Sequence, residues 1–350
     1  MNKFDGACLG LILAFAMTAC TDDGGSNDDE VGDDTESTTE DGTDDTTDDT
    51  TEDTTDDATE DAETTETETD TTGGAECPQH DPIEGAAVGE ACSTNEDCST
   101  QVCLQFQASP PVEGTCEETP ADCNTRTYGR VLDFASGEVV EGIEVRAEAA
   151  LTAAGDPEGA AGLITATSDA NGQFDATSTE PLAAPIGLVA LTSGEGYFIT
   201  ATGLASPVGS TEYGPATTQR DIWAVPEASL TEWSGYLEAD PEFENYLPLG
   251  VAGGVVGRVR DLNTGDPVAG AVVVPTEPDS SNAVLRYLNE AGDGFTDTET
   301  SSNGIFVLIQ PGLGEEFDVE IGGVAQDLVA RAGSATAGGA IFTLIFNATP

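Results

Sequence analysis

The feature that most constrains the fold is an internal repeat in the second half of the chain. The stretch GRVLDFASGEVVEGIEV begins at Gly129 and GRVRDLNTGDPVAGAVV begins at Gly257, and eight of the seventeen positions are identical. Further along, the tetrapeptide NGQF at Asn171 is echoed by NGIF at Asn303. The two copies therefore predict two structural units in tandem, each of about 100 residues.

Each copy is typical of short strands joined by tight turns. A strand with valines on one face leads into a turn at ASGE or NTGD, a second strand follows, and the Asn-Gly pair opens a third. Many short strands separated by glycine-rich turns favour β-sandwiches. The sequence predicts a mainly β protein with sandwiches over residues 124–226 and 251–350.

The pattern G-x-V-x-D, then S/T-G-x-x-V-x-G-x-x-V, then N-G-x-F resembles carboxypeptidase regulatory-like domains over about 200 of the 350 residues. The resemblance implies a transthyretin-like (immunoglobulin-like) sandwich and an accessory or binding role. In carboxypeptidases this module lies beside a zinc-dependent catalytic domain. Because the sequence has one histidine, His80, it cannot supply that zinc site, and peptidase activity is not implied.

Two charged positions recur in register in the repeat. Asp133 and Asp261 follow the first strand, where we expect each carboxylate to accept hydrogen bonds from turn amides, the alternative being a calcium ligand in DLNTGD. Arg130 and Arg258 alternate with valines, so we expect them on the solvated face of that strand. The alternative is that these arginines mark a ligand-binding face.

The N-terminus combines a short apolar run with a cysteine. Residues 7–17 are too short to cross a bilayer but match the apolar region of a secretory signal. The tetrapeptide MTAC that ends at Cys20 resembles a bacterial lipobox, which implies cleavage after residue 19 and acylation of Cys20. An export signal with an incidental cysteine is the alternative. We expect a signal peptide at 1–19 and a membrane anchor on Cys20, because several acyl chains bind a bilayer stably.

An acidic segment follows the cysteine. Residues 21–72 contain 24 Asp or Glu, 18 Thr and no Lys or Arg. Such a composition cannot bury enough apolar surface to offset the entropy of ordering, so we expect residues 20–76 to be a lipidated cysteine and a disordered stalk. The glycine and the bidentate glutamate of a calcium loop are missing from its repeated acidic tract.

A cysteine-rich module is predicted at 77–123. In an exported chain its even number of cysteines indicates three disulfides, because a segment this small cannot be stable on an apolar core alone. Spacing does not choose the pairing, and zinc is a weaker alternative because C-x-x-C is absent. The string VGEACSTNEDCSTQVCL resembles Dickkopf N-terminal modules, which implies a binding or spacer role. The cysteines are Cys77, Cys92, Cys98, Cys103, Cys116 and Cys123.

Two segments depart from the β pattern. For residues 227–250 the sequence predicts a helical linker with a Ser229–Glu232 capping box. We expect the aromatic residues of this linker to pack on a neighbouring domain, the alternative being a platform that binds glycans. Asp240-Pro241 predicts the start of another short helix. For the segment SNAVLRYLNEAG at Ser281 we expect a turn or helix.

Charge limits the partners. The chain has a formal charge of −58, and residues 73–350 alone carry 42 acidic residues and eight arginines. Nucleic acids and anionic membrane surfaces are bound by basic patches, so we expect neither as a partner. No nucleophile motif such as G-x-S-x-G accompanies His80, and we expect no catalytic residues, metal or cofactor. Paired carboxylates of a hydrolase are the remote alternative.

These observations favour a monomeric, non-enzymatic lipoprotein of the bacterial envelope, in the outer membrane or at the cell surface. Cys20 anchors it, the stalk holds the sandwiches away from the membrane, and they bind a glycan, matrix or protein ligand. The alternative is a structural or scaffold subunit of a periplasmic or outer-membrane complex.

Overall fold

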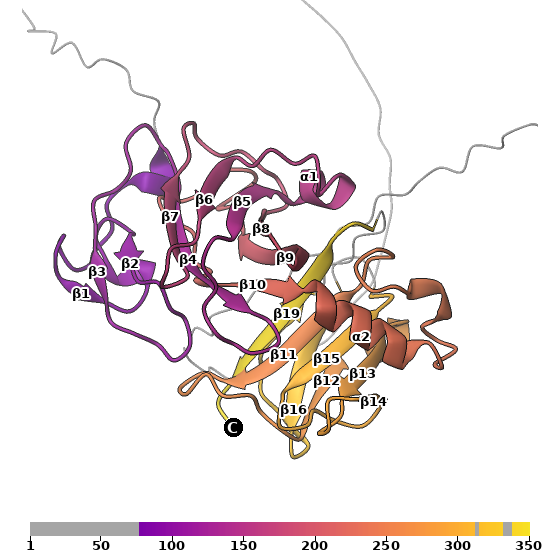
Figure 1. Ribbon diagram of the computed structural model, residues 1–350. Helices are drawn as coiled ribbons and strands as arrows, with labels where there is room; N and C mark the ends of the chain where they lie inside the picture. Colours follow the sequence, from indigo (N-terminus) through magenta and orange to yellow (C-terminus); the bar gives the residue numbers. More distant parts are fainter. Residues whose placement is uncertain (1–76, 312–314, 332–337) are drawn as a thin grey trace, which may run out of the picture. The chain divides into compact units, whose positions relative to one another are not determined.

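The computed structural model describes residues 77–311, 315–331 and 338–350. The predicted signal peptide, Cys20 and the acidic stalk lie outside these residues. The described chain is mainly β, as the sequence predicts, with only two α-helices, α1 (Ala150–Gly155) and α2 (Glu227–Leu237). Figure 1 shows the strands and these helices. Neither helix is long and apolar enough to cross a bilayer.

The cysteine-rich module is a small antiparallel sheet with strand order β1-β3-β2. Among the described residues there are three disulfides, so the disulfide bonding expected from the cysteine count is present: Cys77–Cys123, Cys92–Cys103 and Cys98–Cys116. Four of these cysteines are the module's buried core. Its elements are η1 (Pro78–His80), β1 (Ala91–Cys92), η2 (Asn95–Asp97), β2 (Cys103–Leu104) and β3 (Gly114–Cys116).

The first repeat is built around β4, which pairs antiparallel with β7 and parallel with β10. Next to β10 lies β9, followed by β8, β5 and β6 in antiparallel pairs. The two faces enclose a core of valine, isoleucine, leucine and phenylalanine side chains. The strands are β4 (Arg126–Asp133), β5 (Glu144–Ala149), β6 (Ile164–Thr167), β7 (Gln173–Thr177), β8 (Leu188–Gly194), β9 (Tyr197–Ala205) and β10 (Asp221–Pro226).

The second repeat reproduces these pairings. Strand β11 pairs antiparallel with β15 and parallel with β19, and β12 pairs with β16 as β5 pairs with β8. The strands are β11 (Val255–Asp261), β12 (Ala271–Pro275), β13 (Val284–Leu288), β14 (Phe295–Thr296), β15 (Ile305–Ile309), β16 (Glu316–Ile321), β17 (Val324–Ala325), β18 (Ala330–Arg331) and β19 (Ile341–Ala348). Element η4 (Pro278–Ser280) precedes β13.

Repeated residues have the same local roles in both copies. Oδ1 of Asp133 accepts from the amide of Ser136, and Oδ1 of Asp261 accepts from the amides of Asn263 and Thr264, which confirms the predicted turn role. The glycine in each turn, Gly137 or Gly265, has a φ of +79° or +78°. An L side chain rarely adopts that backbone conformation, which explains why glycine recurs there.

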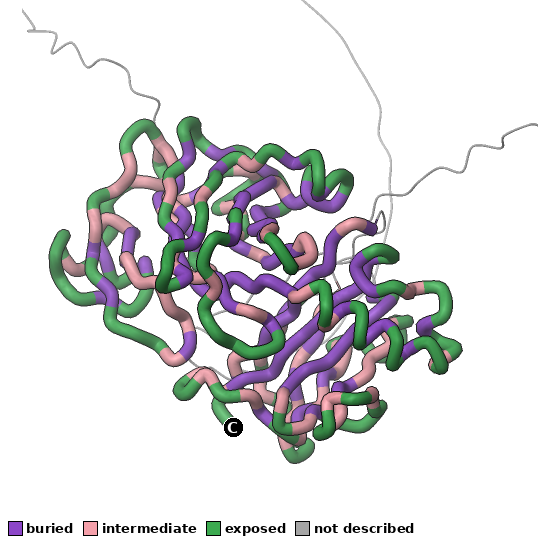
Figure 2. The backbone as a smooth tube through the Cα atoms, in the orientation of Figure 1, coloured by how far each residue is buried: buried purple, intermediate pink, exposed green. Residues whose placement is uncertain are grey.

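The two repeats share one sheet. Strand β9 of the first repeat pairs parallel with β19 of the second, so one path of strands runs β14-β13-β15-β11-β19-β9-β10-β4-β7. Across this seam the hydroxyls of Thr202 and Thr343 lie 2.9 Å apart. The core beneath the second repeat also contains Leu191, Ala201 and alanines of α1 from the first. The first six residues of β11 and of β19 are all buried (Figure 2).

Helix α2 packs on the shared sheet. Leu230, Trp233 and Leu237 are buried in a cluster with Trp223 of β10 and Phe134, whereas Tyr236 is exposed. The helix begins at Glu227 after Pro226 with no side-chain cap, so the predicted Ser229–Glu232 capping box is wrong. Packing of the apolar face decides where this helix begins.

Two other local predictions differ from the structure. The predicted helix at Asp240 is a turn that leads into η3 (Glu244–Tyr246), a single 3-10 turn. The segment after Ser281 forms β13 instead of a turn or helix. Strand β13 lies between β15 and β14, and these inter-strand hydrogen bonds satisfy its backbone better than an isolated helical turn would.

Candidate functional site

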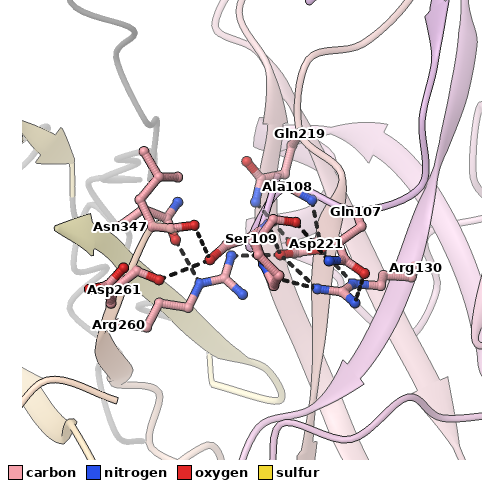
Figure 3. A network of polar contacts seen from close by, with 11 residues as sticks. Gln107, Ala108, Ser109, Arg130, Gln219, Asp221, Arg260, Asp261 and Asn347 are labelled. Atoms are coloured by element: carbon pink, nitrogen blue, oxygen red, sulfur yellow. Dashed lines mark hydrogen bonds and ion pairs between the residues drawn. The ribbon is translucent and has the colours of Figure 1, made fainter. Parts of the chain in front are cut away.

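A buried carboxylate lies where the two repeats and the cysteine-rich module meet. Asp221, the first residue of β10, has no solvent-exposed surface. Its Oδ1 accepts from Nε of Arg130 on the paired strand β4 at 2.8 Å, and its Oδ2 accepts from Nη2 of Arg260 on β11 at 2.6 Å. Figure 3 shows this network. One carboxylate therefore neutralises part of the charge of two arginines, one from each repeat.

The second repeat holds Arg260 from its other side. Nε of Arg260 donates to Oδ1 of Asn347 on β19 at 2.6 Å. Arg260 is 2 % exposed and its guanidinium lies 5.3 Å from the ring centre of Trp223. Burial lowers the pKa of Arg260, with the charge of Asp221 opposing that change. The arginine is thus desolvated and depends on Asp221 for its compensating charge.

A loop of the cysteine-rich module closes the network. The amides of Ala108 and Ser109 donate to the two oxygens of Asp221, each at 3.3 Å. Arg130 donates from Nη1 to the Gln107 side chain at 2.6 Å and from Nη2 to the Ser109 carbonyl at 2.7 Å. The Ser109 hydroxyl donates to the carbonyls of Asp261 and Leu262 (Figure 3). The loop therefore links both repeats.

The prediction that Arg130 and Arg258 lie on a solvated face is wrong. Arg258 is 6 % exposed, and the Arg130 side chain is 15 % exposed. Alternation of valine and arginine would expose the arginines only if one face of the strand met water. Here both faces of β11 are covered, because the strand belongs to a sheet packed on two sides.

A polar cavity of about 260 Å³ adjoins the network. Its lining includes three buried residues, Arg258, Arg260 and Trp223, and the half-buried Arg130. The two repeat-equivalent turns, 136–137 and 264–267, line its outer side. Three arginines converging on one cavity stand out in a domain whose net charge is strongly negative.

Arg258 is the least compensated of these arginines. Its Nη1 donates to the Phe134 carbonyl at 3.0 Å, and its guanidinium lies 5.9 Å from the ring centre of Trp223. Its Nε and the Trp223 Nε1 are buried and have no hydrogen-bond partner among the described residues. Burial and the charge of Arg260 lower the pKa of Arg258, and the charge of Asp133 partly opposes them.

A second cavity, of about 340 Å³, lies between the cysteine-rich module and the first repeat. Beneath it, Oδ1 of Asn95 accepts from the Tyr128 hydroxyl at 3.1 Å and from Nη2 of Arg220 at 2.9 Å. The Arg220 guanidinium lies 4.2 Å from the ring centre of Tyr128. These buried contacts dock the module on β4, so module and repeat form one unit.

The sulfurs of Cys92, Cys98 and Cys116 lie within 4.8 Å of one another, but all three are in disulfides. A metal would need them as thiolates, so this cluster does not offer a metal site. His80 Nε2 lies 3.2 Å from the Tyr213 carbonyl, and burial lowers the pKa of this histidine.

Asp133 also fixes a tyrosine at the edge of this region. The Tyr197 hydroxyl donates to Oδ2 of Asp133 at 3.1 Å. Burial and the charge of Asp133 raise the pKa of Tyr197 to about 12. Burial alone raises the pKa of Tyr213 to about 12.

We expect stability to fall as pH rises from about 10 to about 12, because the unfolded chain loses tyrosine protons that the folded chain keeps. Tyr197→Phe should reduce this slope without removing it, since Tyr213 remains. Urea unfolding at a series of pH values measures it, with Tyr236→Phe on the exposed face of α2 as control. An identical slope in wild type and Tyr197→Phe would contradict the assignment.

Sequence reasoning missed Asp221 and Arg260 and noted only the repeated arginines. Cys20, the predicted anchor, lies outside the described residues. One faint signal was present: an Ala-x-Pro tripeptide recurs in both repeats, as Ala224-Val225-Pro226 in the first and Ala348-Thr349-Pro350 in the second. Aligning them would have placed Asp221 and Ile345 at equivalent positions, opposite Arg130 and Arg258.

No protein-family model matches the chain, and neither does any curated protein. Among solved structures, the chain is similar to the Bacillus anthracis TIE protein, with 13 % identity, a TM-score of 0.17, and 68 % of this chain and 37 % of that chain covered. It is also similar to the shaft pilin SpaA from Lactobacillus rhamnosus GG, with 10 % identity, a TM-score of 0.19, and coverage of 65 % and 98 %. TM-scores this low identify neither a family nor a function for the chain.

Proposed function

We propose that this protein is a non-enzymatic lipoprotein of the bacterial envelope that presents a binding unit on an acidic stalk. The observation that carries the proposal is the fusion of the cysteine-rich module and both repeats around Asp221. This unit has two cavities, one of them polar, and follows in the chain an acidic segment that begins just after Cys20. Such an order suits a rigid binding unit held away from a membrane.

The ligand in this proposal is a glycan, a matrix component or a protein outside the membrane. The resemblance of the repeats to carboxypeptidase regulatory-like domains supports an accessory or binding role. The lipobox-like MTAC supports anchoring through Cys20, and a disulfide-containing module is in keeping with an oxidising compartment.

Protease shaving of intact cells tests surface display. We expect protease to remove the second repeat from wild-type cells, and the Cys20→Ala variant to appear in soluble fractions. Cys8→Ala is the matched control, because that cysteine lies within the predicted signal peptide and its loss should leave anchoring intact. Retention of Cys20→Ala in the membrane would contradict lipid anchoring.

The same experiment separates the two proposed settings. Protection of the wild-type protein until the outer membrane is breached would overturn surface display and favour a scaffold subunit in the periplasm. Co-purification of envelope proteins in stable proportion, with no binding in a glycan and matrix screen, would favour the scaffold further.

A further inference from the structure

We propose that the cavity beside Arg258 binds a single carboxylate group carried by a small, otherwise uncharged ligand. The ligand would have the size of one sugar or amino-acid unit, and Arg258 would be its principal partner. This inference rests on the proposed binding function and names the chemical class of ligand for one site.

The repeat itself indicates which group is missing. In the first repeat, β4 and β10 pair in parallel with Arg130 opposite Asp221. In the second, β11 and β19 pair in the same way with Arg258 opposite Ile345. The second copy therefore keeps the arginine and lacks the carboxylate that accompanies it in the first.

The contact between Arg130 and Asp221 shows how such a carboxylate is held. Nε of Arg130 donates to one oxygen at 2.8 Å, while Nη2 lies 3.5 Å from the other. On Arg258, Nη1 donates to the Phe134 carbonyl, whereas Nε on the equivalent edge is buried and has no partner within the described part of the chain. Planar guanidinium groups bind carboxylates through such paired donors.

The residues around Arg258 include a second unpartnered donor and a glycine. The buried Nε1 of Trp223, another residue of the cavity, also lacks an acceptor among the described residues. Gly137 faces the guanidinium, and a Cβ there would lie 3.4 Å from Nη1 of Arg258. The missing side chain leaves space at the outer end of the guanidinium, where Nη2 would lie 3.9 Å from the same Cβ position.

Size and charge select a small monoanion. A volume of about 260 Å³ lies just below the usual range for drug-sized ligands, roughly 300–1,000 Å³. Exposed Asp266 lies among the lining residues, and the domain as a whole is strongly acidic. The acidic surface of the domain would repel a polymer with many carboxylates more strongly than a ligand with one. A single carboxylate could contact the arginines of the cavity while the rest of the ligand is uncharged.

The test is a titration of the full chain carrying Cys20→Ala, so that acylation does not intervene. Glucuronate is compared with glucose, and N-acetylalanine with its amide, by calorimetry and by NMR of the arginine Nε–H and tryptophan Nε1–H groups. We expect saturable binding of both carboxylates, little binding of the neutral compounds, and shifts of the Arg258 and Trp223 signals. The tighter of the two acids identifies a sugar or a peptide end as the better source.

Variants separate a site from a general charge effect. Arg258→Met should weaken carboxylate binding by about tenfold or more, since it removes a charge-assisted donor pair. Arg331→Met makes the same change at an exposed ion pair with Glu316 and should leave binding unchanged. If Arg258→Met does not fold, the wild-type NMR shifts still decide the matter.

Three results would overturn the inference: no saturation by either carboxylate in the millimolar range, equal binding of acids and neutral compounds, or tighter binding of polygalacturonate than of the monomer. The outcome is independent of cell-surface display. Arg258→Met should leave protease shaving unchanged, and a protein found only in the periplasm would still give the same titrations.

Discussion

Asp221→Ala is expected to lower the free energy of unfolding by about 3–5 kcal/mol. The substitution removes the carboxylate shared by Arg130 and Arg260, and it also leaves the amides of Ala108 and Ser109 without their acceptor. Two desolvated guanidinium groups would then lose their counter-charge, which costs far more than losing an exposed ion pair. Urea unfolding of the full chain measures the change.

Glu316→Ala is the matched control, because it breaks an arginine–carboxylate pair whose arginine is half exposed. Such surface pairs contribute about 0–1 kcal/mol. A second comparison replaces the network with apolar residues, Arg130→Met, Asp221→Leu and Arg260→Met together, which should be less destabilising than Asp221→Ala alone. Equal losses for Asp221→Ala and Glu316→Ala would show that Asp221 does not stabilise the junction.

Removing the disulfide of Cys98 and Cys116 by substituting both with alanine should cost about 3 kcal/mol. The bond closes a loop with a sequence separation of 18, and these cysteines are themselves part of the module's small core. We expect the module to unfold locally, so that limited proteolysis cuts within 77–123 while the β-rich circular dichroism of the repeats persists.

Ser99→Ala, next to Cys98, is the control for the disulfide variant and should keep the wild-type cleavage pattern. The double cysteine variant should also lose part of the stabilisation that Ala108 and Ser109 give to Asp221, because their loop belongs to the same module. A module that resists protease as well as wild type would contradict the view that disulfides hold it together.

Much of the β architecture could be predicted because its signals are local. Two turn features depend on only a few neighbouring residues. One is the glycine at positive φ, Gly137 or Gly265, and the other is the aspartate that accepts from turn amides, Asp133 or Asp261. Disulfide bonding could be expected from the even cysteine count in a short segment, whereas the pairing could not, because sequence spacing does not specify which cysteines become neighbours.

The candidate site could not be predicted because its parts come from distant segments. Arg130 and Asp221 are 91 residues apart, and Asp221 and Arg260 meet only across two repeats. Arginine and valine alternate along β11. The same alternation would occur in a strand with one face in water and in a strand whose two faces are both buried. Local alternation therefore predicted exposure for Arg258, and the structure buries it.

The sequence by itself determined the repeat, its turns and its strand-rich character, since these follow from backbone preferences of short stretches. Only the tertiary structure decided that β9 and β19 pair, that the repeats share a core, and that the arginines face inward around Asp221. The physical reason is that burial and charge compensation depend on which surfaces meet. At equivalent positions the two copies have Asp221 and Ile345. Because of how the strands pair, Arg130 lies opposite a carboxylate and Arg258 lies opposite an apolar side chain.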